Sequence, residues 1–173
     1  MAELVNESDV ISGLAYVLGD DVNTDLNCSS KYLPGKDDAF VAGQAFEAIS
    51  PGFAARFKPG GIIVAGRHFG VNSSREQAVH VLRRMGVAAI VAPSFGRQFF
   101  RNAINNGLPV LECDSSGITD GTLLSADLEA RELQVPGSSP RALRAIPPAI
   151  RALLREGGLI PFLRKHPDWE LPA

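Results

Sequence analysis

The sequence contains few cysteines, and their spacing excludes several kinds of site. Its 173 residues include only two, Cys28 and Cys113, which are too far apart for a CxxC motif. Two such cysteines supply neither a disulfide framework nor the ligands of a zinc ion or an iron–sulfur cluster. Cys113 follows an apolar run and is expected to be a small buried residue. Cys28 lies in a polar loop and is kept as a minor candidate for a site.

The sequence also lacks an excess of charge and any long apolar run. Its 17 basic and 19 acidic residues give a formal net charge of −2, so charge gives no basis for binding nucleic acid or an anionic membrane. No apolar run approaches the roughly 20 residues that span a bilayer. The N-terminus lacks the basic-then-apolar layout of a secretory signal. With 45% hydrophobic residues, these features predict a cytoplasmic globular protein.

The order of expected elements predicts one α/β domain over residues 1–173. Short apolar runs bounded by turn residues predict strands at 12–18, 62–65, 87–92 and 108–111. Helical spacing of apolar residues predicts helices at 39–49, 74–85 and 95–105. This alternation favours right-handed crossovers and a mostly parallel core sheet with flanking helices.

The pattern changes after Asp114. Two further strands, expected to be antiparallel and peripheral, lie at 121–127 and 130–135. The rest is expected to form a surface linker, a proline-interrupted helical region and a loose tail, at 136–140, 141–156 and 166–173. Neither the GxGxxG dinucleotide fingerprint nor the GxxxxGK[ST] phosphate loop occurs, which argues against an oxidoreductase domain.

The most informative segment follows the second expected strand. Residues 66–78 read Gly-Arg-His-Phe-Gly-Val-Asn-Ser-Ser-Arg-Glu-Gln-Ala, a glycine-punctuated loop that enters a helix. Backbone N–H groups at such a helix start are unpaired and favour an anion. Ser73, Ser74 and Arg75 add two hydroxyls and a guanidinium at the same point. Together they can hold a carboxylate and present an oxygen base.

The same residues also fit a purely structural interpretation. Ser73 with Glu76, and Ser74 with Gln77, have the spacing of a capping box. On spacing alone, capping is the simpler interpretation. Arg75 favours a function, because a cation in the first turn opposes the helix dipole unless an anionic ligand offsets it.

A second candidate segment is the long polar loop at residues 20–36, directly after the first expected strand. Asp20, Asp21 and Asp25 in this loop fit Asx turns and solvation as well as a site. Lys31 can pair with a substrate acid or stay solvated, and it is kept as a substrate-binding candidate.

Taken in their order along the chain, the motifs of this sequence resemble those of the small subunit of the two-subunit hydro-lyases of the aconitase superfamily, typified by 3-isopropylmalate dehydratase and homoaconitase. The resemblance covers nearly the whole chain. It is carried by residues 19–25, 31–33, 61–78, 92–95, 99–102, 106–110 and 157–160. It implies a swivelling β/β/α domain. It also implies a heteromer with a large subunit whose [4Fe–4S] cluster acts as a Lewis acid, and activity only in that complex.

The resemblance also implies roles for particular residues. The reaction would dehydrate and rehydrate a hydroxy di- or tricarboxylic acid. By position, Ser73 is the alkoxide base that removes a carbon-bound proton. Ser74 and Arg75 bind the substrate carboxylate, Arg75 through a bidentate fork. Asp25 matches the family's active-site aspartate.

Three segments depart from the family's usual pattern. Asn27-Cys28-Ser29 stands where the family usually has Ile-Ile-Pro, Val71–Gln77 replaces Cys-Gly-Ser-Ser-Arg-Glu-His, and Pro34-Gly35 follows Tyr32-Leu33. The serine and arginine positions are kept, which favours the family's reaction type. The altered loop is expected where the substrate side chain lies. Three alternatives therefore stay open: 3-isopropylmalate, a related substituted malate or homoaconitate-type substrate, and a non-catalytic carboxylate-binding module on the same fold.

Overall fold

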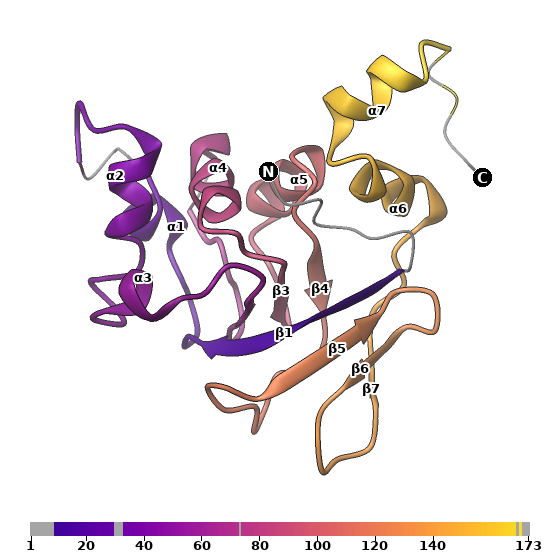
Figure 1. The fold of residues 1–173 in the computed structure, drawn as a ribbon, viewed down its shortest axis with the longest axis horizontal. Coiled ribbons are helices and arrows are strands. Elements are labelled where there is room, and N and C mark those ends of the chain that lie inside the picture. The colour runs from indigo at the N-terminus through magenta and orange to yellow at the C-terminus, as the bar shows by residue number, and fades with distance from the viewer. Residues whose placement is uncertain (1–8, 30–32, 73, 169, 171–173) are drawn as a thin grey trace.

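The computed structural model describes residues 9–29, 33–72, 74–168 and 170 (Figure 1). Seven strands form one sheet in the order β4-β3-β2-β1-β5-β6-β7. The strands are β1 (Val10–Val17), β2 (Ile62–Val64), β3 (Ala89–Ala92), β4 (Val110–Glu112), β5 (Leu123–Asp127), β6 (Glu132–Gln134) and β7 (Arg141–Ala142). The helices are α1 (Thr24–Asn27), α2 (Asp38–Gly43), α3 (Phe53–Arg56), α4 (Glu76–Arg84), α5 (Arg97–Asn105), α6 (Pro148–Arg155) and α7 (Leu159–Lys165). Among the described residues, no helix is both long and apolar enough to cross a bilayer.

Strand β1 belongs to two parts of the sheet. Its residues Ala15–Val17 pair in parallel with β2, which continues in parallel to β3 and β4. Its residues Val10–Leu14 pair antiparallel with β5, which continues antiparallel to β6 and β7. The expected parallel core and antiparallel periphery are therefore both confirmed.

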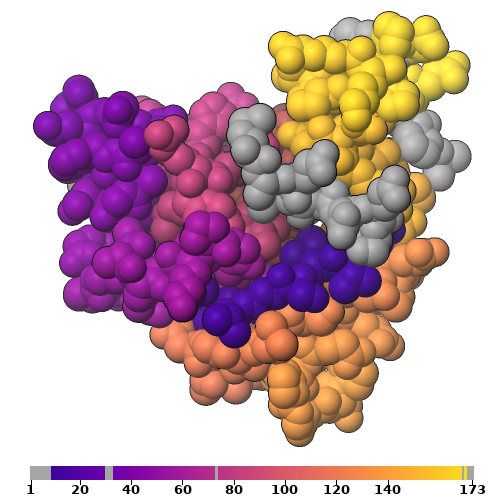
Figure 2. Space-filling model, viewed as in Figure 1, coloured from indigo at the N-terminus to yellow at the C-terminus, as the bar shows by residue number. Residues whose placement is uncertain are grey.

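The helices and the antiparallel strands cover opposite faces of the parallel strands (Figure 1). Side chains alternate along a strand, so Ile63 joins the core beneath the helices while Ile62 and Val64 join a second core. That second core includes Leu124 of β5 and Leu133 of β6. Figure 2 shows β5–β7, in orange, forming the lower part of the molecule. The result is a β/β/α arrangement, which confirms the predicted fold class.

The helix predicted at 39–49 is shorter than expected. It ends at Gly43, and Phe46 adopts the left-handed conformation (φ 61°) in the turns that follow. Phe46 is fully buried, whereas Phe40 and Ile49 are 47% and 50% exposed. A single apolar spacing fitted all three residues, but the chain changes direction between them.

The helical region predicted at 141–156 is also wrong at its start. Residues Arg141–Ala142 form β7, and α6 begins only at Pro148, which occupies a first-turn position. A proline lacks the N–H that a helix interior requires, and it disfavours helical conformation in the preceding residue. Helix α7, after Gly158, is not among the predicted elements.

Candidate functional site

The two candidate loops meet at one edge of the sheet. Because β1 and β2 are parallel neighbours, their carboxyl ends lie side by side, and each is followed by one of the loops. Four backbone hydrogen bonds join the two segments. The donor and acceptor pairs are Leu18 N to Val64 O (2.7 Å), Gly66 N to Gly19 O (3.0 Å), Asp21 N to Arg67 O (2.8 Å) and Gly70 N to Val22 O (2.8 Å). The topology therefore brings together two segments that lie about 45 residues apart in the sequence.

Two of the three loop aspartates have structural or exposed positions. Asp20 Oδ1 accepts a hydrogen bond from the Arg67 backbone N (2.7 Å). A Cβ atom at Gly66 would overlap this carboxylate, so glycine permits the contact. Asp21 faces His68, with Oδ1 3.0 Å from Nδ1, and both side chains are mostly exposed. Of the three, only Asp25 is buried.

Asp25 lies in α1 and faces Arg75 from the other loop. Helix α1 is held at its start by Asn23 Oδ1, which accepts from Leu26 N (3.2 Å). Asp25 Oδ1 lies 4.0 Å from Arg75 Nε, and the Asp25 and Arg75 side chains are 10% and 46% exposed. The ion pair uses the Nε edge of the guanidinium. Within the described chain, no hydrogen bond or ion pair engages the Arg75 terminal nitrogens, which are the atoms of a bidentate fork.

The start of α4 differs from the predicted capping box. Arg75 is the N-cap residue, with extended backbone (φ −88°, ψ 120°) and no side-chain cap. The Gln77 amide donates to Asp38 Oδ1 on α2 (2.8 Å) instead of reaching back toward Ser74. The interpretation of Ser74 and Gln77 as a capping pair is therefore wrong. Ser74 and Arg75, directly before the first turn of α4, are both exposed.

Helix α5 supports this first turn through two asparagines. Asn102 Nδ2 donates to the backbone oxygen of Ser74 (3.2 Å). Asn106 Nδ2 donates to Glu76 Oε1 (2.8 Å). Sequence analysis assigned no role to either asparagine, because each contact spans about 30 residues and asparagine is common near helix ends. No local signal in the sequence identifies such pairs.

An aromatic contact fixes the loop between β2 and α4. The Phe69 ring meets Phe99 of α5 edge-on, with centroids 5.2 Å apart. Gly70 has φ 80°, and a Cβ there would overlap the Phe99 side chain. Glycine is thus required both by the left-handed conformation and by the close packing of the loop on α5.

The altered segment of the first loop is buried. Asn27, Cys28 and Ser29 are 7%, 0% and 2% exposed. Burial raises the pKa of the Cys28 thiol well above its ordinary value, so the thiol stays protonated and Cys28 is not a nucleophile. Two buried side-chain oxygens here, Thr24 Oγ1 and Asn27 Oδ1, have no hydrogen-bond partner among the residues that the structure describes.

The structure thus brings together three of the five predicted site residues, Asp25, Ser74 and Arg75. Ser73 and Lys31 lie outside the described residues. Across the described ranges, no group of three or more histidine, cysteine or acidic side chains could hold a metal. The two cysteines lie in separate cores on opposite faces of the parallel strands.

Comparison with known proteins adds three findings. Residues 40–116 match the aconitase C-terminal domain family. The chain is 41% identical over 158 residues to the 3-isopropylmalate dehydratase small subunit of Sulfolobus acidocaldarius, covering 90% of this chain and 98% of the relative. It is 40% identical over 159 residues to 3-isopropylmalate dehydratase small subunit 2 of Archaeoglobus fulgidus, covering 90% and 96%.

A solved structure shows the same fold. The crystal structure of 3-isopropylmalate dehydratase from Methanocaldococcus jannaschii superposes with a TM-score of 0.83 and 36% sequence identity. The match covers 91% of this chain and 95% of that chain. The similarity therefore extends over most of the length of both chains.

Proposed function

The chain belongs to the family of 3-isopropylmalate dehydratase small subunits, and we propose that it is the carboxylate-binding small subunit of a hydro-lyase. The substrate proposed first is 2-isopropylmalate, converted to 3-isopropylmalate, a step of leucine biosynthesis. One observation carries the proposal: Arg75 stands beside Asp25 at the start of α4, within the segment 66–78 that predicted the chemistry.

Arg75 is proposed to bind a substrate carboxylate with its two terminal nitrogens. Asp25, which faces Nε at 4.0 Å, would orient the guanidinium and offset part of its charge. The Ser74 hydroxyl and the first backbone N–H groups of α4 would complete the anion site. Lys31 is proposed as a further substrate contact from the other loop.

Ser73 is proposed as the base that removes the carbon-bound proton. A serine hydroxyl is ordinarily a weak base, and the helix start and the Arg75 cation would stabilise its alkoxide. Loss of this proton and of the hydroxyl on the neighbouring carbon gives a double bond and water. Return of water with the opposite orientation moves the hydroxyl to the adjacent carbon. When bound in the large subunit, a [4Fe–4S] cluster would supply the Lewis acid that polarises the leaving hydroxyl.

We propose that the chain is active only in a complex with that large subunit. Its relatives are named as small subunits, and the described residues of this chain offer no set of cluster ligands. The chain would therefore contribute the carboxylate site and the base, and its partner would contribute the cluster.

A related substituted malate is the second candidate substrate. The observation that favours it is Asn27, at a position where the family usually has an apolar residue. Its buried Oδ1 has no hydrogen-bond partner within the described part of the chain. An unpaired buried acceptor is costly unless water or a ligand satisfies it. A substrate whose side chain is smaller or more polar than isopropyl would be more compatible with the polar Asn27 side chain.

The test is anaerobic purification of the tagged chain from its host, followed by assays on a panel of hydroxy acids. We expect an iron–sulfur protein to copurify and the complex to interconvert 2- and 3-isopropylmalate. Preference for a methyl-substituted malate or a homoaconitate-type acid would select the second candidate. A chain that copurifies with no iron–sulfur protein under anaerobic handling would contradict the proposal and favour a stand-alone carboxylate-binding module.

A further inference from the structure

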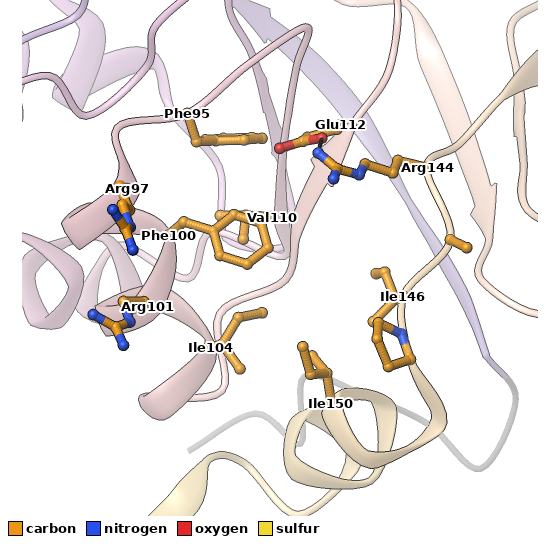
Figure 3. A pocket seen from close by; sticks show the side chains of 12 residues that line it. Phe95, Arg97, Phe100, Arg101, Ile104, Val110, Glu112, Arg144, Ile146 and Ile150 are labelled. Carbon is orange, nitrogen blue, oxygen red and sulfur yellow. Dashed lines mark hydrogen bonds and ion pairs between the residues drawn. The ribbon is translucent and has the colours of Figure 1, made fainter. Parts of the chain in front are cut away.

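A groove of about 500 Å³ lies beside α5 (Figure 3). The candidate site residues Asp25, Ser74 and Arg75 are not among the residues that line it. Its walls are α5, β4 and the segment that leads into α6. Its floor is apolar and consists of Phe95, Phe100, Ile104, Val110, Ile146 and Ile150. In Figure 3, the α5 side chains Phe100 and Ile104 face Ile146 and Ile150 across the groove. Four of the six floor side chains are only half-buried, which leaves apolar surface exposed to water.

The charged residues around the groove are mainly arginines. Arg144 is paired with Glu112, with Nη1 2.5 Å from Oε2, and this pair closes one end. Arg97 and Arg101 project from α5 and are exposed. Within the described part of the chain, no ion pair or hydrogen bond engages either of their side chains. The groove therefore combines an apolar floor with two uncompensated positive charges at its rim.

This combination is typical of a protein interface. Aromatic residues and arginine are enriched where proteins associate, and lysine is depleted. We propose that the groove docks an apolar segment of the large subunit, and that acidic residues on this segment pair with Arg97 and Arg101. The inference rests on the proposed function, which supplies that partner. Charge complementarity selects an acidic segment, because two rim cations would repel a basic one.

Helix α5 connects this groove to the candidate site. One face carries Phe100 and Ile104 into the groove. The other face carries Phe99 against Phe69, and Asn102 donates to the Ser74 backbone oxygen at 3.2 Å. A partner seated in the groove would therefore fix the helix that holds the start of α4.

The first test compares two double charge reversals in the full-length chain. The rim variant carries Arg97→Glu and Arg101→Glu, which replace the two rim cations. The control variant carries Lys58→Glu and Arg84→Glu, which make the same change in charge at exposed positions near the amino ends of β2 and β3. The probe is the copurified iron–sulfur subunit, and association rates are measured anaerobically at low and high salt. We expect the rim variant to associate about tenfold more slowly at low salt, with a smaller difference at high salt, and the control to match wild type.

A second variant tests the apolar floor. Phe100→Ala should accelerate dissociation of the complex about tenfold, with thermal unfolding confirming that the variant is folded. At saturating large subunit, kcat of the rim variant should equal that of wild type, because the groove does not contact the substrate. A wild-type chain that binds no iron–sulfur protein would overturn the proposed function and this inference together.

Equal binding by wild type, both charge variants and Phe100→Ala would overturn the groove assignment alone. Sedimentation tests the remaining alternative, in which the groove binds a second copy of this chain. If the wild-type chain self-associates and only the rim variant does not, the groove binds a second copy, and its assignment to the large subunit is overturned.

Discussion

At the scale of single residues, Arg75 is placed for binding more than for stability. Its side chain is 46% exposed and its distance to Asp25 is 4.0 Å. An ion pair this exposed contributes little to folding, about 0–1 kcal/mol. In the proposed site, the ion pair would hold one edge of the guanidinium so that the other edge meets the substrate carboxylate in a fixed orientation.

This position predicts the effect of Arg75→Lys in the assembled enzyme. Lysine keeps the charge but loses the planar fork, so we expect KM to rise and kcat/KM to fall about 10- to 100-fold. The control is Arg67→Lys, an exposed arginine of the same loop, which should leave both constants unchanged. Wild-type kcat/KM for Arg75→Lys would show that the fork is not used.

Cys28 gives a prediction on pH. Burial raises the pKa of its thiol, so the folded state holds this proton to a higher pH than the unfolded state does. The stabilisation is complete below the ordinary cysteine pKa of about 8.5 and is lost as the pH rises through the raised folded value. Above about pH 8.5, the free energy of unfolding should fall about 1.4 kcal/mol per pH unit more steeply in wild type than in Cys28→Ala. Equal slopes in chemical denaturation would place the thiol in contact with water.

At the scale of elements, the loop between β2 and α4 depends on the absence of a side chain at Gly70. Both Gly70→Ala and Gly117→Ala place alanine at a positive φ, 80° and 69°, which costs about 1–2 kcal/mol each. A Cβ overlaps Phe99 only at Gly70, whereas Gly117 has open space. We therefore expect Gly70→Ala to lose about 1–3 kcal/mol more of unfolding free energy. Equal losses in urea titrations would mean that the Phe99 contact is not tight.

The elements that sequence analysis predicted correctly are those with a strong local pattern. Strands β2 and β3 are short apolar runs bounded by glycine or proline turns, and a buried parallel strand has that pattern. The two-residue β7 has no periodicity of its own and forms because β6 lies beside it. Helix α7 follows two glycines, which usually end a helix rather than precede one.

The site divides in the same way. Ser74 and Arg75 could be identified because they are contiguous and follow a strand. Asn102 and Asp38 could not be identified from the sequence. Asn102 contacts Ser74 and Asp38 contacts Gln77 only after helices α2, α4 and α5 have packed together. The helix predicted from residue 74 begins at Glu76 instead, because Arg75 has an extended backbone and is the N-cap residue.

At the scale of the whole molecule, an ion-pair cluster joins the start of the first strand to helix α6. Asp9, directly before β1, has a side chain only 4% exposed. Its carboxylate accepts hydrogen bonds from Arg151 Nη1 at 3.2 Å and from Arg155 Nε at 2.9 Å. The cluster therefore links residues about 140 positions apart and holds α6 over the sheet.

Removal of the Asp9 charge should destabilise the entire fold. We expect Asp9→Asn to lower the free energy of unfolding by about 1.5–3 kcal/mol, because the buried Asp9 side chain loses its charge-assisted hydrogen bonds to two arginines. Arg144→Ala, which breaks the more exposed pair with Glu112, should cost less than about 1 kcal/mol. A smaller loss for Asp9→Asn than for Arg144→Ala, by urea denaturation, would show that the cluster does not stabilise the fold.

The architecture as a whole explains why one small domain can present a reactive loop to a partner. The parallel strands place both candidate loops at one edge, and α5 supports them from behind. The antiparallel strands stiffen the opposite face. The domain thus holds the proposed carboxylate site between two packed loops, with Ser74 and Arg75 exposed where the proposed second subunit would supply the cluster.

The most direct measurement is the turnover number of the anaerobically assembled complex on 2-isopropylmalate, for wild type and for Ser73→Ala. The account predicts turnover by wild type and a loss of about 10²- to 10⁴-fold in Ser73→Ala, the range expected when a general base is removed. Binding of the large subunit should be unchanged. Near-normal turnover by Ser73→Ala would contradict the assignment of the base. A wild-type complex that turns over no hydroxy acid would contradict the hydro-lyase account itself.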